Sequence, residues 1–226
     1  MNILVVAAHP DDELLGCGGT IAKLAKDHRT DIAILGEGIS SRHLKRSETD
    51  AAALEALRAN ARSVSELLGA TSVVFAGLPD NRFDELPLLD IVKQVERLID
   101  ELSPEVIYTH HPGDLNIDHA ITFRAVMTAT RPIIGCPVKE IYAFEVASST
   151  EWAFQQLGPA FKPNVFVDIG ATIENKLQGM KLYESETRAF PHPRSLEALR
   201  VQARRWGAVV GMEYAESFEL IRSIRG

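Results

Sequence analysis

The sequence predicts a single α/β domain over residues 1–226, with a Rossmann-like, mostly parallel sheet flanked by helices. Short apolar runs of strand length alternate along the chain with longer segments of helical periodicity, which is typical of this class. No internal repeat, low-complexity segment or clear linker interrupts the alternation. A chain of 226 residues that is 46% hydrophobic also suits one substantial core.

The first strand is expected at 3–7, where five consecutive apolar residues indicate burial on both faces of a parallel sheet. The residue pattern predicts five further strands, at 31–35, 72–75, 105–109, 139–145 and 164–168. It predicts helices at 14–26, 49–68, 88–102, 120–130, 173–183 and 195–212. Gly69 closes the second helix, and Ser103-Pro104 is the turn before the strand at 105–109.

The most informative residues follow the first strand directly. His9, Asp11, Asp12 and Glu13 stand in the order His-Pro-Asp-Asp-Glu. Ligands of an open α/β sheet bind in the crevice beyond the carboxyl ends of the strands, and a divalent cation lets crowded carboxylates remain ionised together. Helix capping by Asp11 or Asp12, with Glu13 in the first turn, is the alternative. Capping leaves His9 unexplained.

A second cluster of histidine and aspartate follows the strand expected at 105–109. Residues 110–119 read His-His-Pro-Gly-Asp-Leu-Asn-Ile-Asp-His. Catalytic zinc typically takes three mixed His and carboxylate ligands and leaves one position for water. His9, Asp12 and His119 could supply such a set from two strand ends. The two clusters together favour a metal site.

These motifs resemble those of the LmbE-like, PIG-L superfamily of zinc-dependent de-N-acetylases, which remove acetyl groups from N-acetylglucosamine-type sugars. Residues 8–13 match the Ala-His-Pro-Asp-Asp-Glu motif of that family in full, and Asp118-His119 matches a later motif that ends in Asp-His. Segments 77–83 and 211–218 also read like members of the superfamily. The resemblance implies a metal-dependent amide hydrolase that acts on an N-acetylglucosamine-type sugar or sugar conjugate.

The resemblance further implies that His9, Asp12 and His119 hold zinc and that Asp11 is the general base. Fe²⁺ or Co²⁺ could take the place of zinc, because two histidines and a carboxylate accept several metals. Zinc lowers the pKa of its bound water toward ~7 and polarises the amide carbonyl. Glu13 is expected to orient a ligand, and Asp118 either does the same or caps the helix that follows.

One position departs from the family pattern. Many members have a histidine three residues before the final ligand, where this chain has Asn116. Asparagine can donate a hydrogen bond to a developing oxyanion, but it cannot act as a general acid. His192 is the preferred candidate for the missing acid, because prolines flank it in a Phe-Pro-His-Pro-Arg-Ser segment. His110 and His111 are the alternatives.

Three loops are expected to form the substrate pocket. The loop at 36–42 carries Arg42, which could bind a phosphate or a sugar hydroxyl, or could lie on the surface. The loop at 79–84 offers Asp80 and Asn81 to sugar hydroxyls, although Pro-Asp-Asn is also a good turn sequence. In the loop at 147–152, Trp152 could stack on a pyranose ring or anchor a lid.

The composition excludes several other classes of protein. A net charge of −7, without a basic patch, argues against nucleic-acid binding. No apolar run approaches the ~18 residues of a membrane span, and no targeting segment is evident, so a cytoplasmic protein with no membrane partner is expected. Cys17 and Cys136 lie far apart in the sequence and suggest reduced thiols. The apolar segment 206–212 could be core or the interface of a homo-oligomer.

Three alternative functions are weighed against this one. Gly16, Gly18 and Gly19 could indicate dinucleotide binding, but the carboxylates before them would repel a pyrophosphate. A metal-binding module without turnover would need the ligands but not Asp11. A metal-dependent amidase could also act on an amide outside a sugar.

Overall fold

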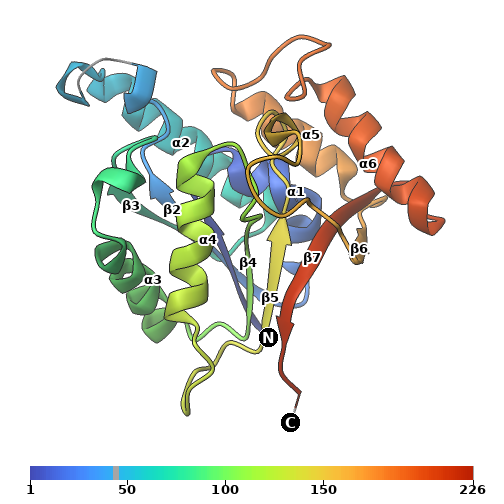
Figure 1. Cartoon of the computed structure of the whole chain (residues 1–226). Helices are drawn as coiled ribbons and strands as arrows, with labels where there is room; N and C mark the ends of the chain where they lie inside the picture. The colour runs from blue at the N-terminus through green and yellow to red at the C-terminus, as the bar shows by residue number, and fades with distance from the viewer. Residues whose placement is uncertain (43–45, 226) are drawn as a thin grey trace.

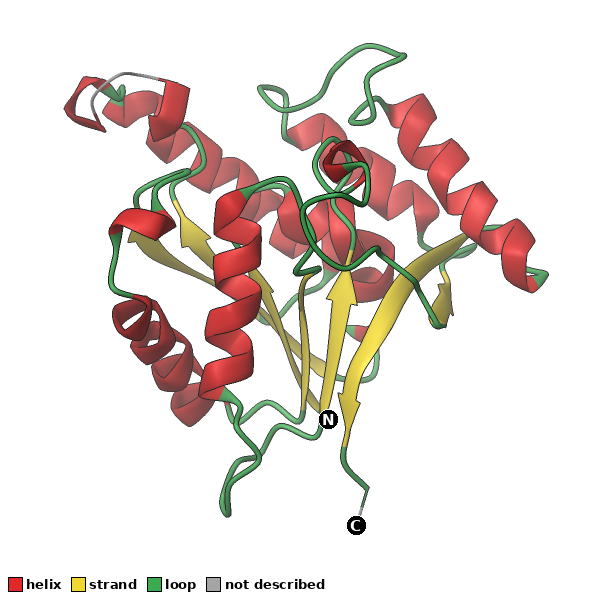
Figure 2. Ribbon diagram, viewed as in Figure 1, coloured by secondary structure: helices red, strands yellow, loops and turns green. Residues whose placement is uncertain are grey.

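Seven strands form one sheet in the order β3-β2-β1-β4-β5-β7-β6, with helices on both of its faces (Figures 1 and 2). The computed structural model describes residues 1–42 and 46–225, with only the backbone of Arg42. The strands are β1 (Asn2–Ala7), β2 (Arg29–Gly36), β3 (Ser72–Leu78), β4 (Val106–His110), β5 (Glu140–Phe144), β6 (Val165–Asp168) and β7 (Ala215–Ser223). The helices are α1 (Asp12–Leu24), α2 (Ala51–Leu68), α3 (Leu88–Leu102), α4 (Ile117–Ala129), α5 (Ile173–Leu182) and α6 (Leu196–Val210).

The five strands β1 to β5 are parallel, and β7 runs antiparallel between β5 and β6. This arrangement confirms the predicted mostly parallel α/β fold. Strand β7 was not predicted, because no continuous apolar run marks it: it buries Glu216 and Ser217 beside Ala215 and Phe218. A buried polar pair in a strand hides the usual pattern.

Both faces of β1 are buried, as its unbroken apolar run predicts. Ile3, Val5 and Ala7 belong to one hydrophobic core, with residues of α1, α2, α5 and α6. Leu4 and Val6 belong to a second core on the opposite face, with residues of α3 and α4. The strand therefore holds two helical layers together and fixes where its carboxyl end lies.

The chain reverses its direction of travel across the sheet between β1 and β4. Strand β1 continues to β2 on one side, whereas β4 lies against its other side and continues to β5. The crevice beyond such a switch point is the usual ligand site of an open α/β sheet. Both predicted His/Asp clusters, at 9–13 and 110–119, begin at this crevice.

Helix α1 is broken inside its sequence at Cys17, where φ is −146°. The carboxylate of Glu216 accepts hydrogen bonds from the backbone N–H groups of Gly19 (3.0 Å) and Thr20 (2.7 Å), which begin the second half of the helix. The Lys176 ammonium donates to the carbonyl of Leu15 (2.8 Å), at the end of the first half. Lys176 and Glu216 also pair with each other at 2.6 Å. One buried ion pair thus satisfies both sides of the break.

The break allows close packing of α1 on the sheet. A Cβ atom added at Gly16 would lie 2.2 Å from the Phe144 ring, so only glycine fits at this position. The glycines of this helix therefore allow close packing and do not indicate a dinucleotide-binding site. Within the described residues, no helix combines the length and apolar character that crossing a membrane requires.

We predict that Glu216→Gln lowers the free energy of unfolding by about 3–5 kcal/mol, because Lys176 is left as a buried, uncompensated charge. Urea unfolding followed by circular dichroism measures the loss. Glu174→Gln is the matched control, since it removes one partner of the surface ion pair Glu174–Arg200 (2.7 Å) and is expected to cost below about 1 kcal/mol. Equal losses in the two variants would contradict the proposed role of the buried pair.

Candidate active site

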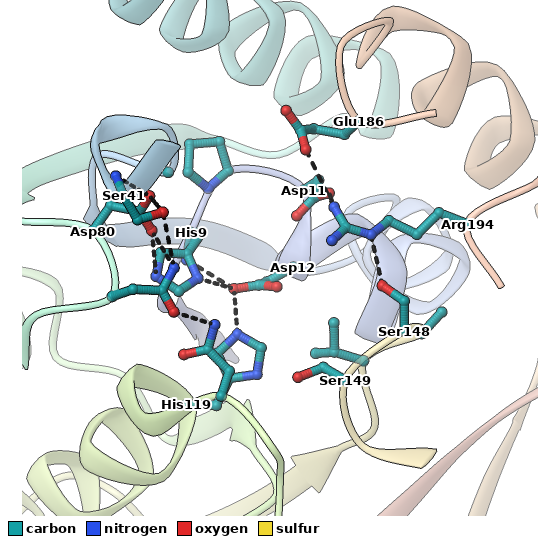
Figure 3. A pocket seen from close by; sticks show the side chains of 16 residues that line it. His9, Asp11, Asp12, Ser41, Asp80, His119, Ser148, Ser149, Glu186 and Arg194 are labelled. Atoms are coloured by element: carbon teal, nitrogen blue, oxygen red, sulfur yellow. Dashed lines mark hydrogen bonds and ion pairs between the residues drawn. The ribbon is translucent and has the colours of Figure 1, made fainter. Parts of the chain in front are cut away.

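A polar cavity of about 200 Å³ lies at the carboxyl ends of β1 and β4 (Figure 3). Residues from the segments that follow the five strands β1 to β5, and from the 186–194 segment, surround it. They are His9, Pro10, Asp11, Asp12, Gly38, Ser41, Asp80, Asn81, Asn116, His119, Val146, Ala147, Ser148, Ser149, Glu186 and Arg194. Charged, amide and hydroxyl groups dominate the set, and they suit a ligand rich in hydrogen-bonding groups.

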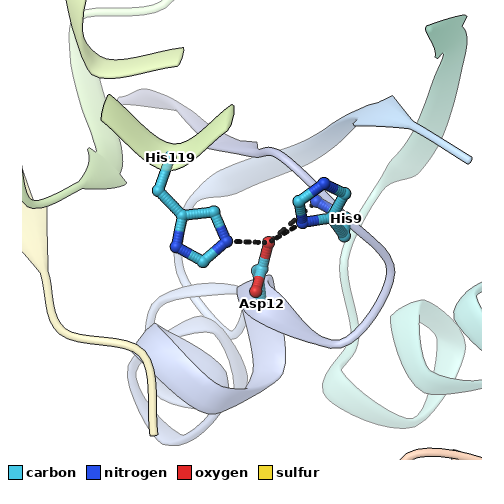
Figure 4. A group of neighbouring side chains, drawn as sticks. All are labelled: His9, Asp12 and His119. Atoms are coloured by element: carbon cyan, nitrogen blue, oxygen red, sulfur yellow. Dashed lines mark hydrogen bonds and ion pairs between the residues drawn. The ribbon is translucent and has the colours of Figure 1, made fainter. Parts of the chain in front are cut away.

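His9, Asp12 and His119 come together at the floor of this cavity (Figure 4). One ligand atom from each lies within 4.8 Å of the other two. The Asp12 Oδ2 atom is 3.3 Å from His9 Nδ1 and 3.2 Å from His119 Nε2. The structure therefore assembles the three expected ligands from the β1–α1 loop and the first turns of α1 and α4.

The chemistry of these three residues fits a divalent cation. The buried Nε2 atom of His119 faces the Asp12 carboxylate at 3.2 Å and makes no hydrogen bond of good geometry within the described residues. Burial raises the pKa of Asp12, but the His119 and His110 rings more than offset this and hold it well below its usual range. An ionised carboxylate between two imidazole nitrogens is a donor set that suits zinc and similar ions.

Two further carboxylates orient the histidine rings. Asp118 Oδ2 lies 2.9 Å from His9 Nε2, and Asp114 Oδ1 lies 3.1 Å from His119 Nδ1. Each ring then directs its other nitrogen toward Asp12, an arrangement common around metal-binding histidines. Burial raises the pKa of Asp114, but bonds from His119, Ser149 and Thr150 lower it to about 2.

Asp118 thus contacts the His9 ring and is not a helix cap. It accepts hydrogen bonds from the backbone N–H groups of Asn81 (2.6 Å) and Phe83 (3.0 Å), and the cap of α4 is Asn116. His9, Asp80 and Asp118 form a second group with metal-ligand spacing. The carboxylates of Asp80 and Asp118 each accept at least two hydrogen bonds from protein donors, including the Ser41 hydroxyl on Asp80 (2.6 Å), whereas Asp12 accepts one from a backbone N–H, that of His9 (2.8 Å). The group with Asp12 is therefore the better metal site.

Asp11 stands at the N-cap position of α1, but its side chain caps nothing. Its backbone has φ 103°, a left-handed conformation that is costly for a residue with a side chain. Glu13 holds this conformation by accepting the Asp11 N–H at 3.1 Å. The Asp11 carboxylate faces the cavity instead. Helix capping consequently does not account for the acidic cluster.

Arg194 is the site residue that sequence reasoning missed. Its guanidinium donates to Asp11 Oδ2 (2.9 Å), to Glu186 Oε2 (3.2 Å) and to the Ser148 hydroxyl (2.7 Å) (Figure 3). Burial raises the pKa of Asp11 well above its usual range, Arg194 lowers it, and Asp12 raises it further. The His-Pro-Arg-Ser segment was recognised in the sequence and contains Arg194, but the prolines on both sides of His192 favoured the histidine as the site residue.

His192 and Trp152 lie outside the lining of the cavity. The ring of His192 packs edge-on against Trp152, with 5.6 Å between centroids. Its Nδ1 atom accepts the backbone N–H of Arg194 at 3.1 Å. The catalytic role of His192 and the binding role of Trp152 remain predictions, and their positions do not support direct contact with a ligand at the metal site.

The two alternative acids are also engaged elsewhere. His110 Nε2 accepts the backbone N–H of Ala8 at 2.8 Å, and burial, reinforced by the nearby His119, lowers its pKa well below the usual value. His111 lies between Glu219 and the carbonyl oxygen of Pro159. Both rings help to fix the loop after β4.

Asn116, Asn81 and Asp80 line the cavity, and their expected roles in catalysis and substrate binding stay predictions. Asn116 Oδ1 accepts the Asp118 N–H (2.9 Å), and its Nδ2 donates to Asn81 Oδ1 (2.9 Å). The side chain of Arg42 lies outside the described residues, so its expected binding role stays a prediction.

We predict that Asp118→Asn weakens metal binding by about 10- to 100-fold, because the substitution removes the negative acceptor that orients His9. Competition between the protein and a chromophoric chelator for Zn²⁺ measures the affinity. Asp84→Asn, at an exposed position three residues after Asn81 in the sequence, is the control and should leave the affinity unchanged. An unchanged affinity in Asp118→Asn would refute the orienting role.

The chain is similar in sequence to known deacetylases. The family described as GlcNAc-PI de-N-acetylase (PIG-L) matches residues 4–130. The diacetylchitobiose deacetylase of Thermococcus kodakarensis is 27% identical over 241 residues, covering 99% of this chain and 84% of that protein.

Solved structures show the same fold. The conserved protein TT1542 from Thermus thermophilus superposes with a TM-score of 0.77 at 24% identity, covering 100% of this chain and 97% of that one. GalB, the 4-carboxy-2-hydroxymuconate hydratase from Pseudomonas putida KT2440, gives 0.74 at 22% identity, covering 100% and 98%. The family match spans more than half of the sequence and includes His9, Asp11, Asp12 and His119. The chain therefore belongs to the PIG-L (LmbE-like) family.

Proposed function

We propose that this protein is a zinc-dependent N-deacetylase, which hydrolyses the acetamide of an N-acetylglucosamine-type sugar or sugar conjugate. One observation carries the proposal: a buried carboxylate, Asp11, faces the cavity beside the set His9, Asp12 and His119 without belonging to it. Metal binding by the three ligands does not itself require this group. Family membership supports the same activity.

His9, Asp12 and His119 would hold the ion. Bound zinc would supply Lewis acidity toward the acetamide carbonyl and a water molecule of lowered pKa. Asp11 accepts the proton of the attacking water, and Arg194 fixes the carboxylate in position for this transfer. Asn116, at the cavity wall, donates a hydrogen bond to the oxyanion that develops on the carbonyl.

The departing amine also needs a proton. Asp11 lines the cavity, and burial raises its pKa. After the attack, Asp11 holds the proton that it took from the water molecule. We therefore propose that Asp11 returns this proton to the amine and acts first as base and then as acid. This assignment replaces the preference for His192, which lies outside the cavity lining.

The rest of the lining supports a sugar as the ligand. Asp80, Asn81, Ser41 and Ser148 offer hydroxyl-binding atoms around the proposed acetamide position. A small N-acetylated sugar or the sugar end of a conjugate would place the acetamide at the floor and its hydroxyls against these groups. GalB shares the fold but is a hydratase, so the assay below measures acetate directly.

We predict that Asp11→Asn retains stoichiometric zinc but loses at least ~100-fold in the rate of acetate release, because the proton acceptor is gone while the ligands remain. A panel of N-acetyl sugars and sugar conjugates is assayed with zinc-loaded and chelator-treated protein. His9→Ala is the control and should lose both zinc and activity. Near-normal turnover by Asp11→Asn would contradict the assignment of Asp11.

We predict that Arg194→Met moves the acidic limb of the pH–rate profile to higher pH. Asp11 must be ionised to accept a proton, and Arg194 lowers its pKa against the effect of burial. Removing the guanidinium raises that pKa, so activity is lost at a higher pH as the solution is acidified. Arg188→Met, which removes an exposed arginine of the same segment, should leave the limb in place. A shift toward lower pH would contradict the argument.

A further inference from the structure

Tyr183 is a buried residue that lies outside the cavity lining but is connected to the carboxylate proposed as the base. It directly follows α5, and its side chain is fully buried. The Tyr183 hydroxyl donates to Glu13 Oε1 at 2.6 Å, and Glu13 is buried as well. Neither residue lines the cavity, and neither belongs to the metal-ligand groups among the described residues. The pair therefore lies behind the site and does not face a ligand in the cavity.

The second oxygen of Glu13 holds the main chain of Asp11. Glu13 Oε2 accepts the Asp11 N–H at 3.1 Å. Asp11 has φ 103° and ψ −25°, a conformation that residues with a side chain rarely adopt and that persists only when the surroundings support it. Because the direction of Cβ changes with φ, a return of Asp11 to negative φ would turn its carboxylate away from its place in the cavity lining. The Tyr183 hydroxyl keeps Glu13 where it prevents this return.

Tyr183 also supports the side chain of Asp11, by a second route. Its main-chain carbonyl accepts the backbone N–H groups of Glu186 (2.9 Å) and Thr187 (3.0 Å), so it fixes the turn in which Glu186 lies. Glu186 Oε2 accepts a hydrogen bond from Arg194 at 3.2 Å, and the same guanidinium donates to Asp11 Oδ2 at 2.9 Å. The end of α5 thus reaches both the backbone and the carboxylate of Asp11.

The metal ligands are held by other contacts. Asp12 Oδ2 accepts the His9 N–H at 2.8 Å, and the Asp12 N–H donates to the His9 carbonyl oxygen at 3.3 Å. Asp118 and Asp114 face the outer nitrogens of the two histidines. Loss of the Tyr183 hydroxyl is therefore expected to disturb Asp11 and to leave the metal in place.

An interaction with the helix dipole explains less about Glu13. An acidic residue in the first turn of a helix gains this interaction at the surface as well. Burial of the carboxylate is costly unless hydrogen bonds satisfy it. Both oxygens of Glu13 have such a bond, one from Tyr183 and one from the Asp11 N–H. The burial of Glu13 is thus directed at Asp11.

We propose that Tyr183 is a positioning residue for Asp11. Through Glu13 it holds the Asp11 backbone in the conformation that places the base in the cavity beside the metal ligands. This inference rests on the proposed deacetylase function. Tyr183 neither touches the substrate nor transfers a proton, so its effect is expected in the catalytic step and not in the binding of metal or sugar.

Acetate release by zinc-loaded Tyr183→Phe is compared with that of the wild-type protein. We expect kcat to fall about tenfold, because a misplaced catalytic group costs rate, while KM and the zinc stoichiometry stay unchanged. The fall should be smaller than that of Asp11→Asn, because the side-chain route remains in this variant. Tyr142→Phe is the matched control: it removes a hydroxyl that donates to Glu140 at 2.6 Å on β5, outside the cavity lining, and should keep kcat.

Glu13→Leu breaks the same connection from its other end and should lower kcat at least as much. In the double variant, Tyr183→Phe should cause little further loss, because the connection is already absent. A kcat at the wild-type level in either single variant would overturn the proposal. So would additive losses in the double variant, or a loss in Tyr183→Phe that comes from a raised KM or from missing zinc.

The geometry is tested without turnover by the backbone amide resonance of Asp11, measured by nuclear magnetic resonance on isotope-labelled, zinc-loaded protein. This resonance is expected to shift in Tyr183→Phe and to keep its position in Tyr142→Phe. An unshifted resonance in Tyr183→Phe would overturn the proposal. A shifted resonance in a protein whose wild type releases no acetate from any N-acetyl sugar would refute the deacetylase function and leave the positioning of Asp11 standing. Acetate release with an unchanged kcat in Tyr183→Phe would refute the positioning role alone.

Discussion

Three consecutive carboxylates, Asp11, Asp12 and Glu13, are buried at the start of one helix, and each requires its own partner. Asp12 faces the histidines of the metal site, Asp11 meets Arg194 at 2.9 Å, and the Tyr183 hydroxyl donates to Glu13 at 2.6 Å. Burial raises the pKa of Glu13 to about 7, although the bond from Tyr183 lowers it. Unpartnered carboxylates could not be buried together at this density. The fold around the helix meets this requirement.

The partners of Asp11 and Glu13 come from the C-terminal third of the chain, far from the carboxylates in the sequence. Tyr183 directly follows α5, Arg194 lies just before α6, and Glu216 on β7 pairs with Lys176 across the break in α1. That break separates the half of the helix that carries the carboxylates from the half that packs between the sheet and α5. The same helix can therefore present charges at one end and bury apolar surface at the other.

The loop after β5 is tied to the metal site by hydrogen bonds. The hydroxyl groups of Ser149 and Thr150 donate to Asp114, whose carboxylate lies 3.1 Å from His119 Nδ1. The orientation of this histidine therefore depends on a loop that also lines the cavity with residues 146–149.

Local sequence determined six of the seven strands, the helices and the metal-ligand candidates, because each leaves a pattern within a few residues. The apolar run at 3–7 and the cluster at 9–13 are adjacent in the chain, so their relation at a strand end was visible. The tertiary structure decided what depends on distant pairs. Arg194 contacts Asp11 across 183 positions, and Glu216 becomes buried in β7 only because Lys176 neutralises it. In the local sequence, neither Arg194 nor Glu216 can be distinguished from a charged residue at the surface. His192 was singled out only because prolines flank it. Burial and electrostatic pairing are properties of the folded chain. They place Arg194, and not His192, in the lining of the cavity beside Asp11.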